Sequence, residues 1–184
     1  MLPHSIIGID LGTNCGWAIL RADGSRVDSG TWRLGNGTAR LVALRDHAAD
    51  ILRNEVWEHR KENVVLCHER VVVHPLPKKP GQRHRGTAVL AAQSYGGLRD
   101  ILRLAIHDAG VRAYSLLPQQ WKKTAVNHGN ASKPLYIQAA NDRYGLSLTL
   151  SGEDEAAALG VAYACFRELG GPQLPITGEQ REIA

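Results

Sequence analysis

The segment SIIGIDLGTNCGWAILR, residues 5–21, sets the start of the predicted fold. Its first six residues form a short apolar run that ends in Asp10, and residues 16–21 form a second apolar run after a glycine-bearing turn. Asp23-Gly24 is typical of a hairpin turn, and residues 26–34 alternate as a strand does. The chain is therefore predicted to open with an antiparallel three-stranded meander.

Helices and strands alternate along the rest of the chain. Residues 63–69 (NVVLCHE) form a nearly continuous apolar strand of the kind buried on both faces, and this strand also ends on a carboxylate. Helical spacing and turn residues predict helices over about 39–62 with Thr38 as cap, 87–109, a short stretch from Pro118, 132–144 capped by Ser132, and 154–169, with a further strand over 111–117. The predicted class is α/β: a mixed five-stranded sheet, made of the antiparallel meander and two parallel strands, flanked by helices.

Length and composition are those of one globular domain. The chain has 184 residues, of which 43% are hydrophobic and 22% charged, enough to bury a core without disulfides. We expect one domain over residues 1–170 and a loose tail over 171–184. No apolar run reaches the roughly 20 residues of a membrane span, and the start lacks a signal sequence, so a cytosolic location is expected.

The basic residues are segregated along the sequence. No acidic residue lies between Glu69 and Asp100 or between Asp108 and Asp142, and these two stretches hold 10 of the 22 lysines and arginines. The rest of the chain holds the other 12 basic residues and all 18 acidic ones. This pattern favours a positive face for a polyanion on an acidic body. The alternative is a set of solvated loops whose lysines meet acids in three dimensions.

Acidic residues occur where metal-ion chemistry would need them. Asp10 and Glu69 end the two buried strands, and Glu153, Asp154 and Glu155 stand at the start of the last helix. Magnesium prefers oxygen ligands, and a nuclease uses such ions to orient a phosphate, activate water and neutralise the leaving oxygen. We expect these acids to converge if the first and fourth strands are neighbours. Taken singly, each is more often a plain surface residue.

Several motifs, in their order, resemble the RuvC family of Holliday-junction resolvases, particularly its phage-type members. They are IIGIDLGTNCGWAI, VVLCHER, a basic loop leading to GTAVLAAQSYGGLRDIL, LPQQWKKTAVNHGNASK and DEAAALGVAYA, over residues 5–169. The resemblance implies an RNase H-like fold and a symmetric homodimer in a bacterial or phage-infected cell. It also implies magnesium-dependent incision of branched DNA, with manganese as a substitute, giving 5′-phosphate and 3′-hydroxyl ends.

The resemblance also implies roles for individual residues. Asp10, Glu69 and Asp154 match the family's catalytic metal ligands, and Lys133 matches a lysine with an active-site role. The family places a second acid on the final helix where this chain has Ala157. Three explanations stay open: an engineered inactive variant, a natural member that recruits Glu153 or Glu155 as a ligand, or a protein that binds junctions without cutting them.

The basic segments supply candidate DNA contacts. Lys78, Lys79, Arg83 and Arg85 lie in the basic loop, and Lys122 and Lys123 lie in the motif that resembles the family's basic segment. We expect all six to contact the phosphate backbone irrespective of base sequence. For Lys122 and Lys123 the alternative is an ordinary exposed helix face. The four tryptophans are expected in the core or at an interface.

Three other functions compete with this hypothesis. IGIDLGT also opens actin-like and heat-shock-chaperone ATPases, but these need two related lobes and a second phosphate-binding turn, and the chain has no Walker-type motif. Nucleotide binding is therefore not expected. A non-catalytic branched-DNA binder remains an alternative because of Ala157. An RNase H-like nuclease acting on RNA:DNA hybrids also remains open.

Overall fold

The computed structural model describes residues 2–175 except 71–84, with the backbone alone over 85–93. Its five-stranded sheet has the order β3-β2-β1-β4-β5. β1 pairs antiparallel with β2, which pairs antiparallel with β3, whereas β4 runs parallel to β1 and β5 parallel to β4. The strands are β1 (Ser5–Asp10), β2 (Asn14–Arg21), β3 (Arg26–Arg33), β4 (Val64–Glu69) and β5 (Arg112–Leu116). The predicted mixed sheet is confirmed.

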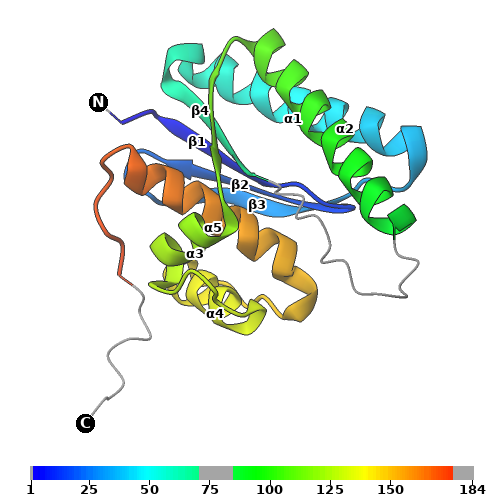
Figure 1. Ribbon diagram of the computed structural model, residues 1–184. Coiled ribbons are helices and arrows are strands. Elements are labelled where there is room, and N and C mark those ends of the chain that lie inside the picture. Colours follow the sequence, from blue (N-terminus) through cyan, green and yellow to red (C-terminus); the bar gives the residue numbers. More distant parts are fainter. Residues whose placement is uncertain (1, 71–84, 176–184) are drawn as a thin grey trace.

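Helices cover both faces of the sheet (Figure 1). One layer contains α1 (Gly37–His59) and α2 (Arg85–Ala109), and the other contains α3 (Pro118–Val126), α4 (Lys133–Tyr144) and α5 (Glu153–Glu168). Two short 3₁₀ helices, η1 (Lys61–Asn63) and η2 (Leu150–Gly152), precede β4 and α5. No helix in the described part of the chain has the length and apolar character needed to span a bilayer.

Of the two predicted helix caps, Thr38 is wrong and Ser132 is confirmed in position only. α1 begins at Gly37, so Asn36 occupies the N-cap position and Thr38 lies inside the first turn. α1 also ends three residues before its predicted end. Ser132 does occupy the N-cap position of α4, but its side chain makes no capping hydrogen bond. The other predicted element ends lie within two residues of the observed ones. Turn residues thus locate the ends of elements well, although they do not show which side chain caps a helix.

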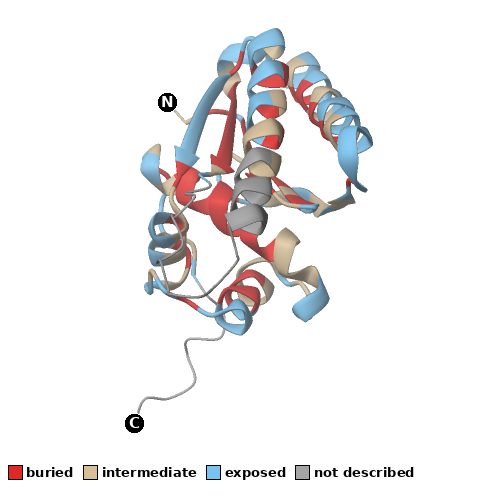
Figure 2. Cartoon of the chain, turned by 45° about the vertical axis from the view of Figure 1, so that its right-hand side comes forward, coloured by how far each residue is buried: buried red, intermediate tan, exposed pale blue. Residues whose placement is uncertain are grey.

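The alternation of side chains in β1 divides the core into two layers. Ile7 and Ile9 pack with α1 and α2, whereas Ile6 packs in the layer under α5. α5 is buried on every side from Ala156 to Phe166, and Figure 2 shows it as a continuous buried helix. A helix that is apolar all round belongs in the interior of a domain. α5 therefore forms the centre of the second layer.

Two glycines allow α5 to approach the sheet closely. A methyl group at Gly8 of β1 would overlap the main-chain oxygen of Ala158, and one at Gly16 of β2 would overlap the main-chain oxygen of Asp154. Asp10 pairs with Gly16 across β1 and β2. This close packing therefore brings the first turn of α5 to the end of β1 that carries Asp10.

The segment after α5 turns back along that helix. The amide of Gly171 donates to the carbonyl of Phe166 at 2.9 Å, and the amide of Leu174 donates to the Tyr163 hydroxyl at 3.1 Å. Leu174 also packs on the core layer under α5. The start of the tail predicted over 171–184 thus contacts α5, and residues 176–184 lie outside the described part of the chain.

Gly16→Ala is expected to lower the free energy of unfolding by about 1–3 kcal/mol, because β2 and α5 must separate to admit the new methyl group. Gly96→Ala is the matched control, since a methyl group there meets no atom within 4 Å and α2 gains helix propensity. Chemical denaturation of both variants measures the difference. Equal stability of Gly16→Ala and the unaltered chain would contradict the close packing.

Candidate active site

Two carboxylates end neighbouring parallel strands on the same face of the sheet. Ile9 of β1 lies beside His68 of β4, so the next residues, Asp10 and Glu69, end the two strands together. Asp10 alternates with Ile9, and Glu69 with His68, which directs both carboxylates toward the α5 layer. His68 is directed to the other face and is 7% exposed, with Nδ1 3.0 Å from the carbonyl oxygen of Glu69. His68 is therefore buried on the opposite face of the sheet from the two carboxylates.

The first turn of α5 adds further carboxylates at the same place. The pKa of Asp10 lies well above its ordinary value, first because the group is buried and then because the negative charges of Glu69, Asp154 and Glu153 act on it. The pKa of Asp154 is raised by burial and by Glu153. Carboxylates from β1, β4 and α5 thus form one acidic cluster: Asp10, Glu69, Glu153 and Asp154. These acids, predicted to converge, thus lie within electrostatic range of one another, and their role as metal ligands stays a prediction.

The two glutamates that flank Asp154 have different surroundings. Glu153 Oε2 is 2.5 Å from the ammonium of Lys133, and Glu153 acts electrostatically on Asp10. Glu155 Oε1 instead accepts a hydrogen bond of 2.6 Å from the hydroxyl of Ser29 on β3. Glu153 therefore belongs to the acidic cluster, whereas Glu155 is held against the neighbouring strand.

The side chain of Trp121 contacts this cluster directly. Its indole Nε1–H donates a hydrogen bond of 2.6 Å to Oε2 of Glu69. Burial raises the pKa of Glu69, while this hydrogen bond and the charge of Lys122 oppose the rise. The sequence predicted Trp121 as a core or interface residue, and it is in fact only 1% exposed. No local pattern reveals the hydrogen bond, because it joins residues 52 positions apart.

Two lysines lie beside the acidic cluster. The ammonium of Lys122 sits 5.5 Å from the ring centre of Trp121 and 5.4 Å from that of Tyr136, and its charge lowers the pKa of both Asp10 and Glu69. Lys133 is exposed, and its pKa is raised chiefly by the hydrogen bond to Glu153. The pKa of Tyr136 is raised by burial and by the cluster's four carboxylates, so its hydroxyl stays protonated.

The donor set of the cluster suits a hard divalent cation. It offers only carboxylate oxygens, and burial of several negative charges together leaves charge that a cation would neutralise. Within residues 2–70 and 94–175, no three His, Cys, Asp or Glu side chains already stand close enough to coordinate one ion. A cation would therefore have to draw the carboxylates together.

Ala157 lies in the core layer under α5 and is 4% exposed. It follows Asp154 by three positions on α5, so the two share a helix face. The methyl group offers no ligand. The helix face that resembles the family's two-acid motif therefore presents one carboxylate, with Glu153 beside it.

The side chains of four predicted DNA contacts are not described by the structure. Lys78, Lys79 and Arg83 lie outside the described residues, and Arg85 begins α2 in the stretch described as backbone alone. Lys123 is exposed on α3, as expected for a DNA contact. Lys122, predicted to contact the DNA backbone, lies beside the acidic cluster.

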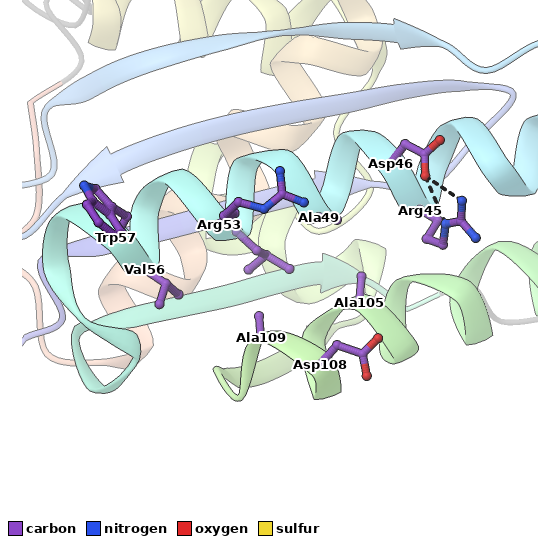
Figure 3. Close-up of a pocket in the computed structure, with 10 residues that line it drawn as sticks. Arg45, Asp46, Ala49, Arg53, Val56, Trp57, Ala105, Asp108 and Ala109 are labelled. Atoms are coloured by element: carbon purple, nitrogen blue, oxygen red, sulfur yellow. Dashed lines mark hydrogen bonds and ion pairs between the residues drawn. The ribbon is translucent and has the colours of Figure 1, made fainter.

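A cavity on the other side of the sheet is separate from these residues. It lies between α1 and α2, and its lining includes Arg53, Trp57 and Asp108 (Figure 3). Trp57 is 86% exposed there, so of the two places expected for it, core or interface, the core is wrong. The sheet separates this cavity from the acidic cluster.

Asp10→Asn is expected to raise the free energy of unfolding at pH 7 by on the order of 1 kcal/mol in EDTA, because ionised Asp10 is buried among other carboxylates and asparagine carries no charge. Asp50→Asn, which alters an exposed ion pair with Arg53, is the control and should change little. Denaturant titration measures both. A less stable Asp10→Asn variant would show that the charge is already compensated.

The chain is similar in sequence to a curated protein over most of its length. No family model matches the chain. It is 26% identical over 165 residues to the crossover junction endodeoxyribonuclease RuvC of Heliobacterium modesticaldum, which covers 89% of this chain and 94% of that protein. The similarity therefore runs through both proteins almost from end to end.

Solved structures share the fold. Thermus thermophilus RuvC superposes with a TM-score of 0.66 at 17% identity, covering 93% of this chain and 99% of that one. RuvC of T. thermophilus in complex with a Holliday junction substrate gives 0.64 at 18% identity, covering 90% and 95%. The yeast mitochondrial Holliday junction resolvase Ydc2 gives 0.55 at 15% identity, covering 92% and 80%. The chain therefore has the predicted RNase H-like fold, shared with these RuvC structures, and its sequence is similar to that of a RuvC protein, as the motifs indicated.

Proposed function

We propose that this chain is a structure-selective endonuclease that resolves four-way DNA junctions by metal-dependent hydrolysis. The observation that carries the proposal is the convergence of Asp10, Glu69, Asp154 and Glu153 from three separate elements, beside two lysines. A buried group of like charges destabilises a fold, so such a group is typical of a functional site. The RuvC relative in H. modesticaldum supports the same reaction class.

Magnesium, with manganese as a substitute, is the proposed cofactor, held by Asp10, Glu69 and Asp154. When bound, the ion orients the scissile phosphate, activates water and neutralises the leaving oxygen. The carboxylates bind the ion and confine it to the ends of β1 and β4. The oxygen-only donor set of the cluster supports this choice of metal.

We assign to Glu153 the role of the missing second acid of α5. Ala157 offers no ligand, and Glu155 is bound to Ser29, whereas Glu153 acts on both Asp10 and Asp154. Lys133 holds Glu153 in the absence of other cations. This arrangement favours a natural member that recruits a neighbouring acid over an inactivated variant.

The lysines are proposed to act on the DNA phosphates. Lys133 is exposed and lies next to Glu153, so its ammonium can hold the scissile phosphate or stabilise charge on the leaving oxygen. Lys122 reaches the same place from α3, over two aromatic rings. Lys123 would contact the backbone further away, as would the loop residues Lys78, Lys79, Arg83 and Arg85.

The proposed substrate also determines the assembly and the location. A four-way junction needs two coordinated cuts, and a twofold-symmetric homodimer supplies two identical sites. The RuvC structure with a Holliday junction substrate supports branched DNA as the partner. We place the reaction in the cytoplasm of a bacterial or phage-infected cell, where that DNA is found.

A second candidate function is junction binding without cleavage. The observation that favours it is Ala157, which leaves one acid fewer on the α5 face than the RuvC-like motif has. DNA binding would then rest on the lysines and arginines proposed as backbone contacts, and the acidic cluster would have no catalytic role.

The test is cleavage by the purified chain of four-way, forked, linear and RNA:DNA hybrid substrates, in magnesium, in manganese and in EDTA. We expect paired incisions in four-way junctions with either metal, none in EDTA, and slower cutting of the other substrates. Retarded migration of the junction in a gel without incision in either metal would favour the non-catalytic binder. Preferential cutting of the hybrid would favour a ribonuclease.

Glu153→Gln is expected to lower the junction-cleavage rate at least tenfold, because the site loses a charged ligand. Glu155→Gln removes a charge from the same helical turn and is the matched control. It should leave the rate nearly unaltered, because Glu155 is hydrogen-bonded to Ser29 and does not belong to the acidic cluster. Single-turnover cleavage rates measure both variants. A rate that falls with Glu155→Gln and not with Glu153→Gln would reverse the assignment.

Ala157→Asp, combined with Glu153→Gln, tests whether the two positions supply the same carboxylate. We expect the double variant to regain cleavage that Glu153→Gln has lost. Because residue 157 is buried, the new acid should also lower the melting temperature in EDTA, with recovery in magnesium. Thermal melts with and without magnesium measure this, and Ala39→Asp, at an exposed position of α1, is the control. Absence of any rescue would mean that Glu153 acts in another way.

A further inference from the structure

We infer that Trp121 is a positioning residue for Glu69: its indole holds one carboxylate oxygen and leaves the other for the cation. This rests on the proposed metal-dependent function and adds a residue that the acidic motifs do not include. The hydrogen bond from Nε1 to Oε2 is 2.6 Å long and joins a neutral donor to a charged acceptor. Such charge-assisted bonds are stronger than those between neutral groups.

The indole is fixed by its surroundings. Trp121 is 1% exposed, and its ring lies over Gly160 of α5, where a methyl group would come within 2.7 Å of the ring carbons. Tyr136 meets the ring edge-on at a centroid distance of 5.4 Å. The ring therefore has no room to rotate away, and its N–H group stays directed at Glu69.

Glu69 needs such a partner because the sheet fixes its main chain and not its side chain. It is the last residue of β4 and pairs with Leu116 of β5, and the amide of Arg70 donates to the carbonyl of Leu116 at 2.7 Å. A glutamate has three side-chain torsions, and ordering it for a cation costs conformational entropy. A fixed donor at one oxygen lowers that cost, as outer hydrogen bonds to metal ligands do in general.

The indole of Trp121 connects three elements whose relative positions determine the spacing of the carboxylates. Trp121 belongs to α3, packs on α5 and bonds to the end of β4. Asp154 lies on the α5 helix and Glu69 on β4. The spacing between these two carboxylates is therefore set in part by one side chain of α3.

Trp121→Phe removes the N–H group and keeps an aromatic ring. We expect it to weaken manganese binding to the full chain on the order of tenfold or more, measured by isothermal titration calorimetry without DNA. Trp57→Phe is the matched control, because Trp57 is exposed on α1 on the other side of the sheet. Unchanged manganese affinity in a folded Trp121→Phe variant would overturn the inference.

A double-mutant cycle separates positioning from general stability. If Trp121 acts through Glu69, then Trp121→Phe should have little further effect on manganese affinity in a Glu69→Ala background. Independent, additive losses in the two backgrounds would assign Trp121 a merely structural role and overturn the inference. The single Glu69→Ala variant supplies the reference.

The hydrogen bond can also be detected by NMR spectroscopy, in the absence of metal and of DNA cleavage. In ¹⁵N-labelled protein, the indole N–H resonance that disappears in Trp121→Phe should shift upfield in Glu69→Ala, while the Trp57 resonance stays in place. An unmoved resonance would overturn the inference. Failure of the proposed function is read separately, from the absence of junction cleavage by the unaltered chain, so the two failures are distinguishable.

Discussion

The close contact between α5 and the β1-β2 pair is the constraint on which the rest of the structure depends. Gly8 and Gly16 carry no side chain, and the main-chain oxygens of Ala158 and Asp154 occupy the space that a methyl group would need. The helix that bears Asp154 can therefore lie directly on the strand that ends in Asp10. A larger residue at either glycine would separate the acids that the site brings together.

This contact has an energetic cost, because it places like charges together. The pKa of Asp10 is raised by burial and by three neighbouring carboxylates, and the nearby cations, Lys122 and Lys133, offset the repulsion in part. The apolar burial of α5 from Ala156 to Phe166 provides the opposing stabilisation. A stable core thus holds a cluster that would disperse in an unconstrained chain.

Aromatic side chains connect that core to the carboxylates. Trp121 is buried against Gly160 of α5 and donates to Glu69, while Trp121 and Tyr136 together face the ammonium of Lys122. Both rings are buried and place apolar surface beside the carboxylates, and electrostatic interactions are stronger in such surroundings than in water. The acids, the lysine and the rings therefore form one connected unit, and a change in any of them should alter the others.

The order of strands and helices, the carboxylates at the ends of two apolar strands and the acidic start of the last helix could be read from the sequence, because hydrophobic periodicity and turn residues act locally. The N-cap of α1 could not be read in this way, because asparagine and threonine both favour that position and Asn36, not Thr38, occupies it. Only the tertiary structure distinguished Glu153 from Glu155 and revealed the bond from Trp121 to Glu69. Those contacts join residues far apart in sequence, and their geometry follows from how α3 and α5 pack on the sheet.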